Sequence, residues 1–175
     1  MKFAYADPPY FENGKRLSKA KQRYLGLHDN PNEYDSKNKH YDLIDSLMSD
    51  YPDGWAMSCN PKDLPWLLPY LPKDIRICAW TKTFHQIRVN VSVQYAWEPL
   101  LLYKGRDMRH RRPMTRDWVS CRIAMKKGLS GAKPEEFYDW LLDVIGYEDG
   151  DEMHDLFPGT DGLRQAINKR LSKLL

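Results

Sequence analysis

The sequence predicts an α/β fold built on a mainly parallel sheet. Three short apolar runs, residues 3–6, 55–59 and 75–81, have the length and composition of buried strands. Segments with helical spacing or turn residues separate them, and strands that alternate with helices form βαβ units. A fourth run, residues 95–103, follows the third after a loop only, which predicts an antiparallel pairing at one edge of the sheet.

The first predicted strand ends at Asp7-Pro8-Pro9-Tyr10. Proline cannot continue a strand, so the Asp7 carboxylate lies at a strand's carboxyl end, where open α/β sheets bind their ligands. The Pro-Pro turn fixes a carbonyl beside it, and Tyr10 and Phe11 supply aromatic rings. A carboxylate, a rigid carbonyl and a ring suit the binding of a planar amine. Taken alone, the motif is also compatible with a tight turn that caps an edge strand.

A long polar segment follows, and we expect a mobile basic loop over residues 11–40. Residues 14–24 contain five basic side chains, among them Lys15 and Arg16, and no acidic one. Loops of this length inside a compact domain are usually functional or disordered. We interpret this one as a lid beside Asp7 that binds phosphate, with a merely solvated loop as the alternative.

The remaining elements follow from spacing and stop signals. Apolar residues at helical spacing predict helices at residues 41–48, 63–70, 133–145 and 163–175, and an alternating run predicts a strand at 117–125. The third helix has acidic residues in its first turn and Gly146 as its stop signal. Residues 153–162 form a strand and a glycine-containing turn, an arrangement that presents backbone N–H groups to a ligand.

Residues 104–116 are the most basic segment, with six Lys or Arg side chains and one Asp among thirteen residues. Such a segment is poorly suited to a core and well suited to phosphates, so we predict a nucleic-acid-binding loop. The candidate contacts are Arg106, Arg109, Arg111, Arg112 and Arg116. A soluble loop without a binding role is the alternative.

Length and composition predict one domain over residues 1–175, with a single core. No run of 18 apolar residues and no signal peptide is present, so a cytoplasmic protein without a membrane span is expected. Three widely spaced cysteines indicate reduced core thiols. Neither they nor the five His show a metal-binding spacing, so no metal is predicted. The net charge of +3 is too small to identify a polyanionic partner.

Two motifs in a particular order identify a family resemblance. Asp7-Pro8-Pro9-Tyr10 precedes a helix that opens at Lys133-Pro134-Glu135 and a turn that reads Asp155-x-Phe157-x-Gly159. This order resembles the circularly permuted S-adenosylmethionine-dependent amino-methyltransferases. These include β-type DNA adenine-N6 enzymes, small phage-type ones especially, and the messenger-RNA adenosine methyltransferases. The resemblance implies a Rossmann-like methyltransferase fold, permuted and shortened, with helices on both faces of the sheet.

The resemblance also implies roles for residues at the matching positions. Asp7 and the Pro8 carbonyl would accept the two N–H groups of the adenine amine, and Tyr10 would stack on the flipped base. Asp7 would border the methyl donor as well. The donor's methionine part would contact Lys133, Asp155, Phe157 and Gly159. The target base would lie near Phe11, Trp80, Lys82 and Trp97, although each tryptophan is equally compatible with a core position.

The chain departs from the family pattern in two places. Asp161 stands where the DNA enzymes usually have a glycine, in Phe157-Pro-Gly-Thr-Asp-Gly162. Thirteen residues follow Gly162, enough for a helix but not for the two strands that usually hold the donor's ribose and adenine. The lid, or a second subunit in a homodimer, would then hold the donor's adenosine.

The predicted function is therefore methyl transfer from S-adenosylmethionine to the N6 amine of adenine in DNA. Adenosine in RNA is an alternative substrate; cytosine-N4 is another, although those enzymes usually carry Ser in place of Asp7. A non-catalytic member that binds nucleic acid is the third alternative. A phage-type enzyme would act in the host cytoplasm, and low sequence specificity is expected, because residues 106–116 are too few for a recognition domain.

Overall fold

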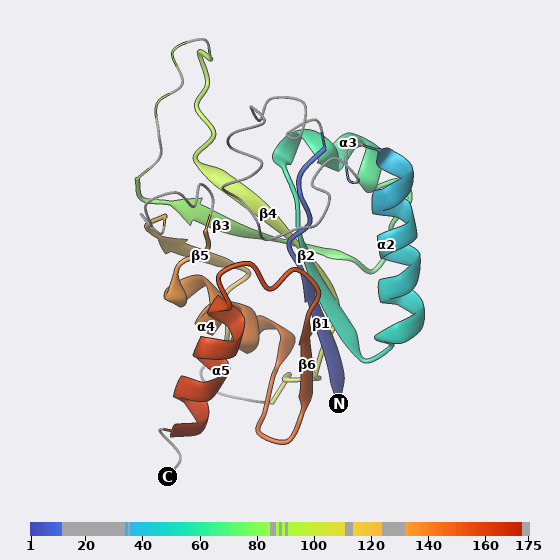
Figure 1. Cartoon of the computed structure of the whole chain (residues 1–175), viewed down its shortest axis with the longest axis vertical. Coiled ribbons are helices and arrows are strands. Elements are labelled where there is room, and N and C mark those ends of the chain that lie inside the picture. The colour runs from blue at the N-terminus through green and yellow to red at the C-terminus, as the bar shows by residue number, and fades with distance from the viewer. Residues whose placement is uncertain are drawn as a thin grey trace.

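The computed structural model of the protein describes residues 1–11, 34, 36–84, 87, 89, 91–110, 114–123 and 132–172. Its centre is one six-stranded sheet with the strand order β5-β3-β4-β2-β1-β6 (Figure 1). The strands are β1 (Lys2–Ala6), β2 (Gly54–Ser58), β3 (Arg76–Lys82), β4 (Trp97–Lys104), β5 (Trp118–Cys121) and β6 (Glu152–Asp155). β1 pairs in parallel with β2 and β6, and β3 pairs in parallel with β5.

The antiparallel strand is predicted correctly, but its predicted position at the sheet edge is wrong. β4 lies inside the sheet, antiparallel to both β2 and β3, and β5 forms the edge instead. The sequence contains the reason, because residues 100–103 read Leu-Leu-Leu-Tyr and are buried on both faces. An unbroken apolar run of this kind is typical of an interior strand.

Helices cover both faces of the sheet, as predicted. They are α2 (Lys37–Asp50), α3 (Leu64–Leu67, after the short 3-10 helix Pro61–Asp63), α4 (Glu135–Ile145) and α5 (Gly162–Ser172). Side chains alternate between the two faces along each strand. Phe3 and Tyr5 pack in the core beneath α4 and α5, whereas Ala4 and Ala6 pack in the core beneath α2 and α3 (Figure 1).

Helix limits follow local chemistry where the chemistry is strong. α4 ends before Gly146, the predicted stop signal, which adopts a left-handed conformation with a φ of 75°. α2 begins at Lys37, earlier than predicted. The sequence does not indicate this start, because residues 37–39 are polar and exposed and show no apolar periodicity. The three cysteines are free and buried, as expected of core thiols. Within the described ranges, no helix is long and apolar enough to cross a membrane.

Candidate active site

Four charged side chains from distant parts of the chain meet at one end of the sheet. Asp7 follows β1, Lys82 is the last residue of β3, and Lys133 lies two residues before α4. Glu98 is the second residue of β4. Because β4 runs antiparallel to its neighbours, its first residues lie at the end of the sheet where β1 and β3 finish. The strand directions therefore bring these four side chains together.

Lys133 is the centre of this cluster. Its ammonium group donates hydrogen bonds to both oxygens of Asp7, at 2.9 and 2.8 Å. It also lies 3.3 Å from the Tyr10 hydroxyl and 3.3 Å from Oε2 of Glu98. The Lys133 side chain is only 3% exposed, so its charge is compensated by protein groups rather than by water. Asp7 and Lys133, predicted to border the donor, are thus in direct contact.

Glu98 is a site residue that sequence reasoning missed. Its Oε2 accepts a hydrogen bond of 2.9 Å from the Tyr10 hydroxyl, and its Oε1 pairs with the Lys82 ammonium group. The sequence offers one signal for it, a single acidic residue inside the apolar run 95–103. That signal does not reveal the role, because Glu98 lies near Tyr10 and Lys133 only in the folded chain. Burial opposes ionisation of Glu98, but Lys133 and Lys82 outweigh it, so the pKa of this carboxyl is lowered.

The cluster favours the charged forms of Glu98 and Lys133. Burial opposes the charged form of Lys133, but Asp7 and Glu98 together raise its pKa above the ordinary value. Burial, then the charges of Glu98 and Asp7, raise the pKa of the Tyr10 hydroxyl well above its ordinary value, so Tyr10 stays a neutral donor. At neutral pH, an ionised Glu98 and an ionised Lys133 therefore lie beside a neutral Tyr10 phenol.

A hollow of about 320 Å³ adjoins this cluster through Lys133. It is lined by Lys133, Pro134, Glu135, Tyr138, Thr160, Gly162, Gln165 and Lys169. Gly162 is needed here for space, because a methyl group on its Cα would overlap the Tyr138 ring. Asp161 adopts a φ of 62°, the left-handed conformation that glycine favours and that Asp tolerates better than most residues. Asp161, where the sequence resemblance predicts a glycine, thus has a backbone conformation that most residues adopt only with strain.

Asp155 ends β6 beside the motif strand, where it pairs in register with Tyr5. Its Oδ1 accepts a hydrogen bond of 3.2 Å from the Phe157 backbone N–H and so caps the turn that follows β6. Burial, and to a smaller extent the charges of Asp7 and Asp161, raise the pKa of Asp155 to about 6. Phe157 packs against the core beneath α2 and α3. Its neighbour Gly159 also has a positive φ, 45°.

The aromatic residues predicted for the base pocket lie in different settings. Trp80 is buried in the core, 1% exposed, and its ring lies 5.5 Å from that of Phe137. Trp97 is 37% exposed at the start of β4. Phe11 is half-buried and packs edge-on against Trp66, 5.7 Å between ring centres. The pocket role of these residues stays a prediction, and Trp80 already fills a core position.

The described part of the basic segment leaves the sheet at the end opposite to Asp7. Lys104 pairs with Gly54, the first residue of β2, so about 20 Å of strand separates it from Glu98. Arg106 donates to Asp151 and to the Gly146 carbonyl oxygen, and Arg109 pairs with Asp107. The contacts of Arg106 attach this residue to the rest of the protein, whereas the pair of Arg109 and Asp107 lies within the segment.

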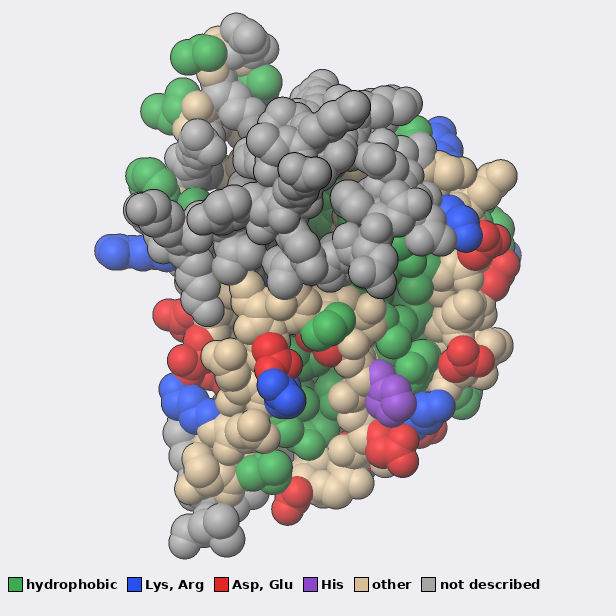
Figure 2. Space-filling view, viewed as in Figure 1, with side chains coloured by type: hydrophobic (Ala, Val, Ile, Leu, Met, Phe, Trp, Pro, Cys, Tyr) green, Lys and Arg blue, Asp and Glu red, His purple; other side chains and the backbone are tan. Residues whose placement is uncertain are grey.

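The other predicted nucleic-acid contacts are only partly visible. Lys15, Arg16, Arg111 and Arg112 lie outside the described residues. The Arg116 guanidinium lies 5.4 Å from the centre of the Trp118 ring. On the face shown in Figure 2, basic side chains lie next to acidic ones. The nucleic-acid contacts therefore stay a prediction.

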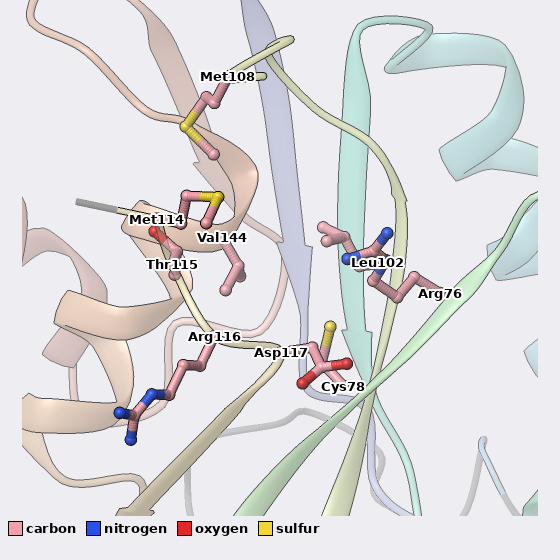
Figure 3. Close-up of a pocket in the computed structure, with 9 residues that line it drawn as sticks. All are labelled: Arg76, Cys78, Leu102, Met108, Met114, Thr115, Arg116, Asp117 and Val144. Carbon is pink, nitrogen blue, oxygen red and sulfur yellow. The ribbon is translucent and has the colours of Figure 1, made fainter. Parts of the chain in front are cut away.

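A second hollow, of about 200 Å³, lies away from the cluster (Figure 3). It is lined by Arg76, Cys78, Leu102, Met108, Met114, Thr115, Arg116, Asp117 and Val144. Leu102 is four residues along β4 from Glu98, and the two hollows share no lining residue. Among the described residues, no group of three or more His, Cys, Asp or Glu side chains is arranged to hold a metal ion.

Comparisons with known proteins support the fold. No protein-family model and no curated protein matches the chain. Among solved structures, the chain is similar to M1.HpyAVI, whose crystal structure is that of a complex with SAM. The TM-score is 0.54 at 13% sequence identity, over 96% of this chain and 77% of that one. The likeness confirms the predicted α/β fold class with a mixed, mostly parallel sheet.

Proposed function

We propose that the chain is an S-adenosylmethionine-dependent methyltransferase that methylates the N6 amine of adenine in DNA. The observation that carries the proposal is the position of Asp7. It follows the β1 strand end in an Asp-Pro-Pro-Tyr turn and contacts Lys133, which also lines a hollow at the lower end of the size range of ligand pockets. The fold shared with M1.HpyAVI, a structure that contains SAM, supports the choice of donor.

The chemistry follows from the amine. The lone pair of the adenine N6 atom is delocalised into the ring, which makes the nitrogen a poor nucleophile. Asp7 and the Pro8 carbonyl, accepting one N–H each, favour a tetrahedral nitrogen and stabilise the positive charge that develops on it. The nitrogen then forms its bond to the methyl carbon while the carbon–sulfur bond breaks, and the surplus N–H proton passes to water or to Asp7.

The contacts of Asp7 define what substrate binding must change. Both carboxylate oxygens accept hydrogen bonds from Lys133, so the amine must either share Asp7 with this ammonium group or displace one of its bonds. Lys133 lines the adjoining hollow as well, where the donor's carboxylate would attract its ammonium group. Binding of the donor and binding of the base would therefore each compete with the ion pair between Lys133 and Asp7.

Asp155 gives the donor site a pH dependence. With a pKa of about 6, it is mainly ionised at pH 7.5 and mainly protonated at pH 5. A carboxylate attracts the donor's ammonium group and a neutral carboxyl does not, so the affinity for S-adenosylmethionine should fall roughly tenfold between pH 7.5 and pH 5. Glu98 and Lys133 keep their charges over this range, because the pKa of Glu98 is lowered and the pKa of Lys133 is raised.

Calorimetric titration of the protein with S-adenosylmethionine at both pH values measures this change. Asp155→Asn keeps an oxygen that can accept from the Phe157 N–H and removes the charge. It should bind weakly at both pH values. An affinity of the unaltered protein that does not change with pH would exclude Asp155 from contact with the donor's ammonium group.

A transfer assay tests the function itself. The protein is incubated with methyl-labelled S-adenosylmethionine and, in parallel, with duplex DNA, single-stranded DNA, RNA, and DNA that lacks adenine. Label on the N6 atom of adenine in DNA is the expected result. Label found only in RNA, or only on cytosine, would change the proposed substrate but would support the proposed methyl transfer to an amine. Donor binding without transfer to any nucleic acid would favour the non-catalytic alternative.

A further inference from the structure

Glu98 contacts three groups of the proposed site at once. The Tyr10 hydroxyl donates to its Oε2 at 2.9 Å, the Lys133 ammonium group lies 3.3 Å from the same oxygen, and Lys82 pairs with its Oε1. The Glu98 side chain is only 14% exposed. Both of its oxygens are therefore engaged by protein groups in a largely water-free setting.

The first consequence concerns Lys133. Its ammonium group is held by two carboxylates, with Asp7 the nearer and Glu98 the farther. When Asp7 accepts the amine of a substrate, Lys133 loses part of its compensation while it is still buried. A buried ammonium group without a carboxylate is strongly unfavourable, and Glu98 is the charged group already in place to compensate it.

The second consequence concerns Tyr10. Its hydroxyl is 2.9 Å from Glu98 but 3.4 Å from Asp7, so Glu98 is its closer acceptor. A side-chain hydrogen bond to a fixed strand residue restricts the rotation of the ring. The orientation of the ring that would stack on the base therefore depends on Glu98 more than on Asp7.

We propose that Glu98 is a positioning residue, which holds Lys133 and Tyr10 in place while Asp7 is engaged by the substrate amine. The proposal rests on the proposed function, since it assigns Asp7 to the amine. It predicts that loss of the Glu98 charge impairs the transfer step. Asp7 is then the remaining carboxylate beside Lys133, so Lys133 competes more strongly with the substrate amine for Asp7. The Tyr10 hydroxyl also loses its charged acceptor, so the ring is less restrained.

A purely structural role for Glu98 makes a different prediction. Lys82 and Glu98 sit on the paired strands β3 and β4, so their ion pair could serve only to join these strands. In that case, removal of either charge should have the same effect. Lys82→Gln is therefore the matched control for Glu98→Gln, because it breaks the same pair and keeps the contacts of Glu98 with Tyr10 and Lys133.

The experiment compares Glu98→Gln, Lys82→Gln and the charge-balanced double variant in the full chain. We expect Glu98→Gln to lower kcat on the order of 10–100-fold, as for other losses of positioning, with a smaller change in KM for the donor. Because Lys82 is also predicted near the target base, Lys82→Gln should raise KM for the nucleic acid, but it should lower kcat less than Glu98→Gln does. The double variant should have the kcat of Glu98→Gln. Equal losses of kcat in the two single variants, or recovery of kcat in the double variant, would overturn the proposal.

A second readout does not depend on enzymatic activity. In protein labelled with carbon-13 at tyrosine Cζ, NMR titration follows the Tyr10 hydroxyl, with Tyr10→Phe to assign its signal. Glu98→Gln should lower the pKa of Tyr10, because the Glu98 charge contributes to its rise, and Lys82→Gln should not lower it. An unchanged Tyr10 pKa in Glu98→Gln would overturn the contact on which the proposal depends.

If the unaltered protein transfers no methyl group, but Glu98→Gln shows the expected fall of the Tyr10 pKa, the proposed function is refuted and the Glu98 contacts stand. Transfer by the unaltered protein with no loss in Glu98→Gln would refute the Glu98 role alone. If Glu98→Gln does not fold, Glu98→Asp is tested in its place. This variant keeps the negative charge, but its shorter side chain places the carboxylate farther from the Tyr10 hydroxyl. That variant should show a partial loss of kcat.

Discussion

Asp7→Asn is expected to lower the rate of methyl transfer by about 10³-fold or more, and to leave the fold in place. Asn has the size of Asp and keeps one acceptor oxygen, but it lacks the negative charge that stabilises the developing ammonium of the substrate. Its amide nitrogen would also face Lys133, where Asp7 now accepts two hydrogen bonds. Transfer of label from S-adenosylmethionine to adenine measures the effect.

The fold should survive because Lys133 keeps Glu98 as a second carboxylate, 3.3 Å away. The loss of unfolding free energy should therefore stay below the ~3–5 kcal/mol that follows when a buried charge is left without any partner. Denaturant unfolding measures it, and Asp42→Asn, on the exposed face of α2, is the matched control. An Asp7→Asn protein that is folded and transfers methyl groups at the rate of the unaltered protein would contradict the proposed mechanism.

Much of the fold could be predicted because its signals are local. The apolar strand β1 stops at Pro8, and α4 shows acidic residues at its start and Gly146 at its end. Each of these features depends on residues close together in the chain. The position of β4 depends instead on which strands pair with it. Its apolar run is typical of a strand buried on both faces, whereas the loop before it predicts an edge position, which the strand order contradicts.

The candidate site was predicted only in part, for a physical reason. Asp7 and Tyr10 are three residues apart in a rigid turn, so their grouping can be read from the chain. The contact between Asp7 and Lys133 joins residues 126 positions apart, and the resemblance assigned Lys133 to the donor rather than to Asp7. Glu98 reaches Tyr10 from 88 positions away and had no motif of its own.

Charge alone was a weaker guide than geometry. Residues 104–116 are the most basic segment of the chain, yet Arg106 is bound to Asp151 at the far end of the sheet. A net count of charges along the sequence does not reveal which of them are already compensated within the protein. Lys82, by contrast, lies at the Asp7 end of the sheet and is paired with Glu98.

Lys133→Met should have the largest effect on stability. Met has nearly the length of Lys and no charge, so the substitution removes the buried cation without a large cavity. Glu98 keeps Lys82, but Asp7 loses the cation that binds both its oxygens, and the two carboxylates then repel each other. Breaking a buried pair on one side costs about 3–5 kcal/mol, and we expect a loss of this size at pH 7.

The pH dependence of this loss identifies its cause. In the unaltered protein, the pKa of Glu98 is lower in the folded state than in the unfolded state. Ionised Glu98 therefore stabilises the fold at a pH above its unfolded-state pKa, and this stabilisation is lost as the pH falls through its folded-state pKa. Without Lys133, burial instead favours protonation of the carboxyl groups, so acid relieves their repulsion. The difference in unfolding free energy between the two proteins should therefore shrink from pH 7 toward pH 4.5.

Urea unfolding at the two pH values measures this difference. Lys169→Met is the control, because Lys169 also pairs with a carboxylate, Glu135, but is 49% exposed. That variant should lose little stability at either pH, as exposed ion pairs contribute about 0–1 kcal/mol. A loss in Lys133→Met that is equally large at pH 7 and pH 4.5 would point to packing alone. A loss that shrinks with acid would assign it to the charges of Asp7 and Glu98, the pair on which the proposed chemistry depends.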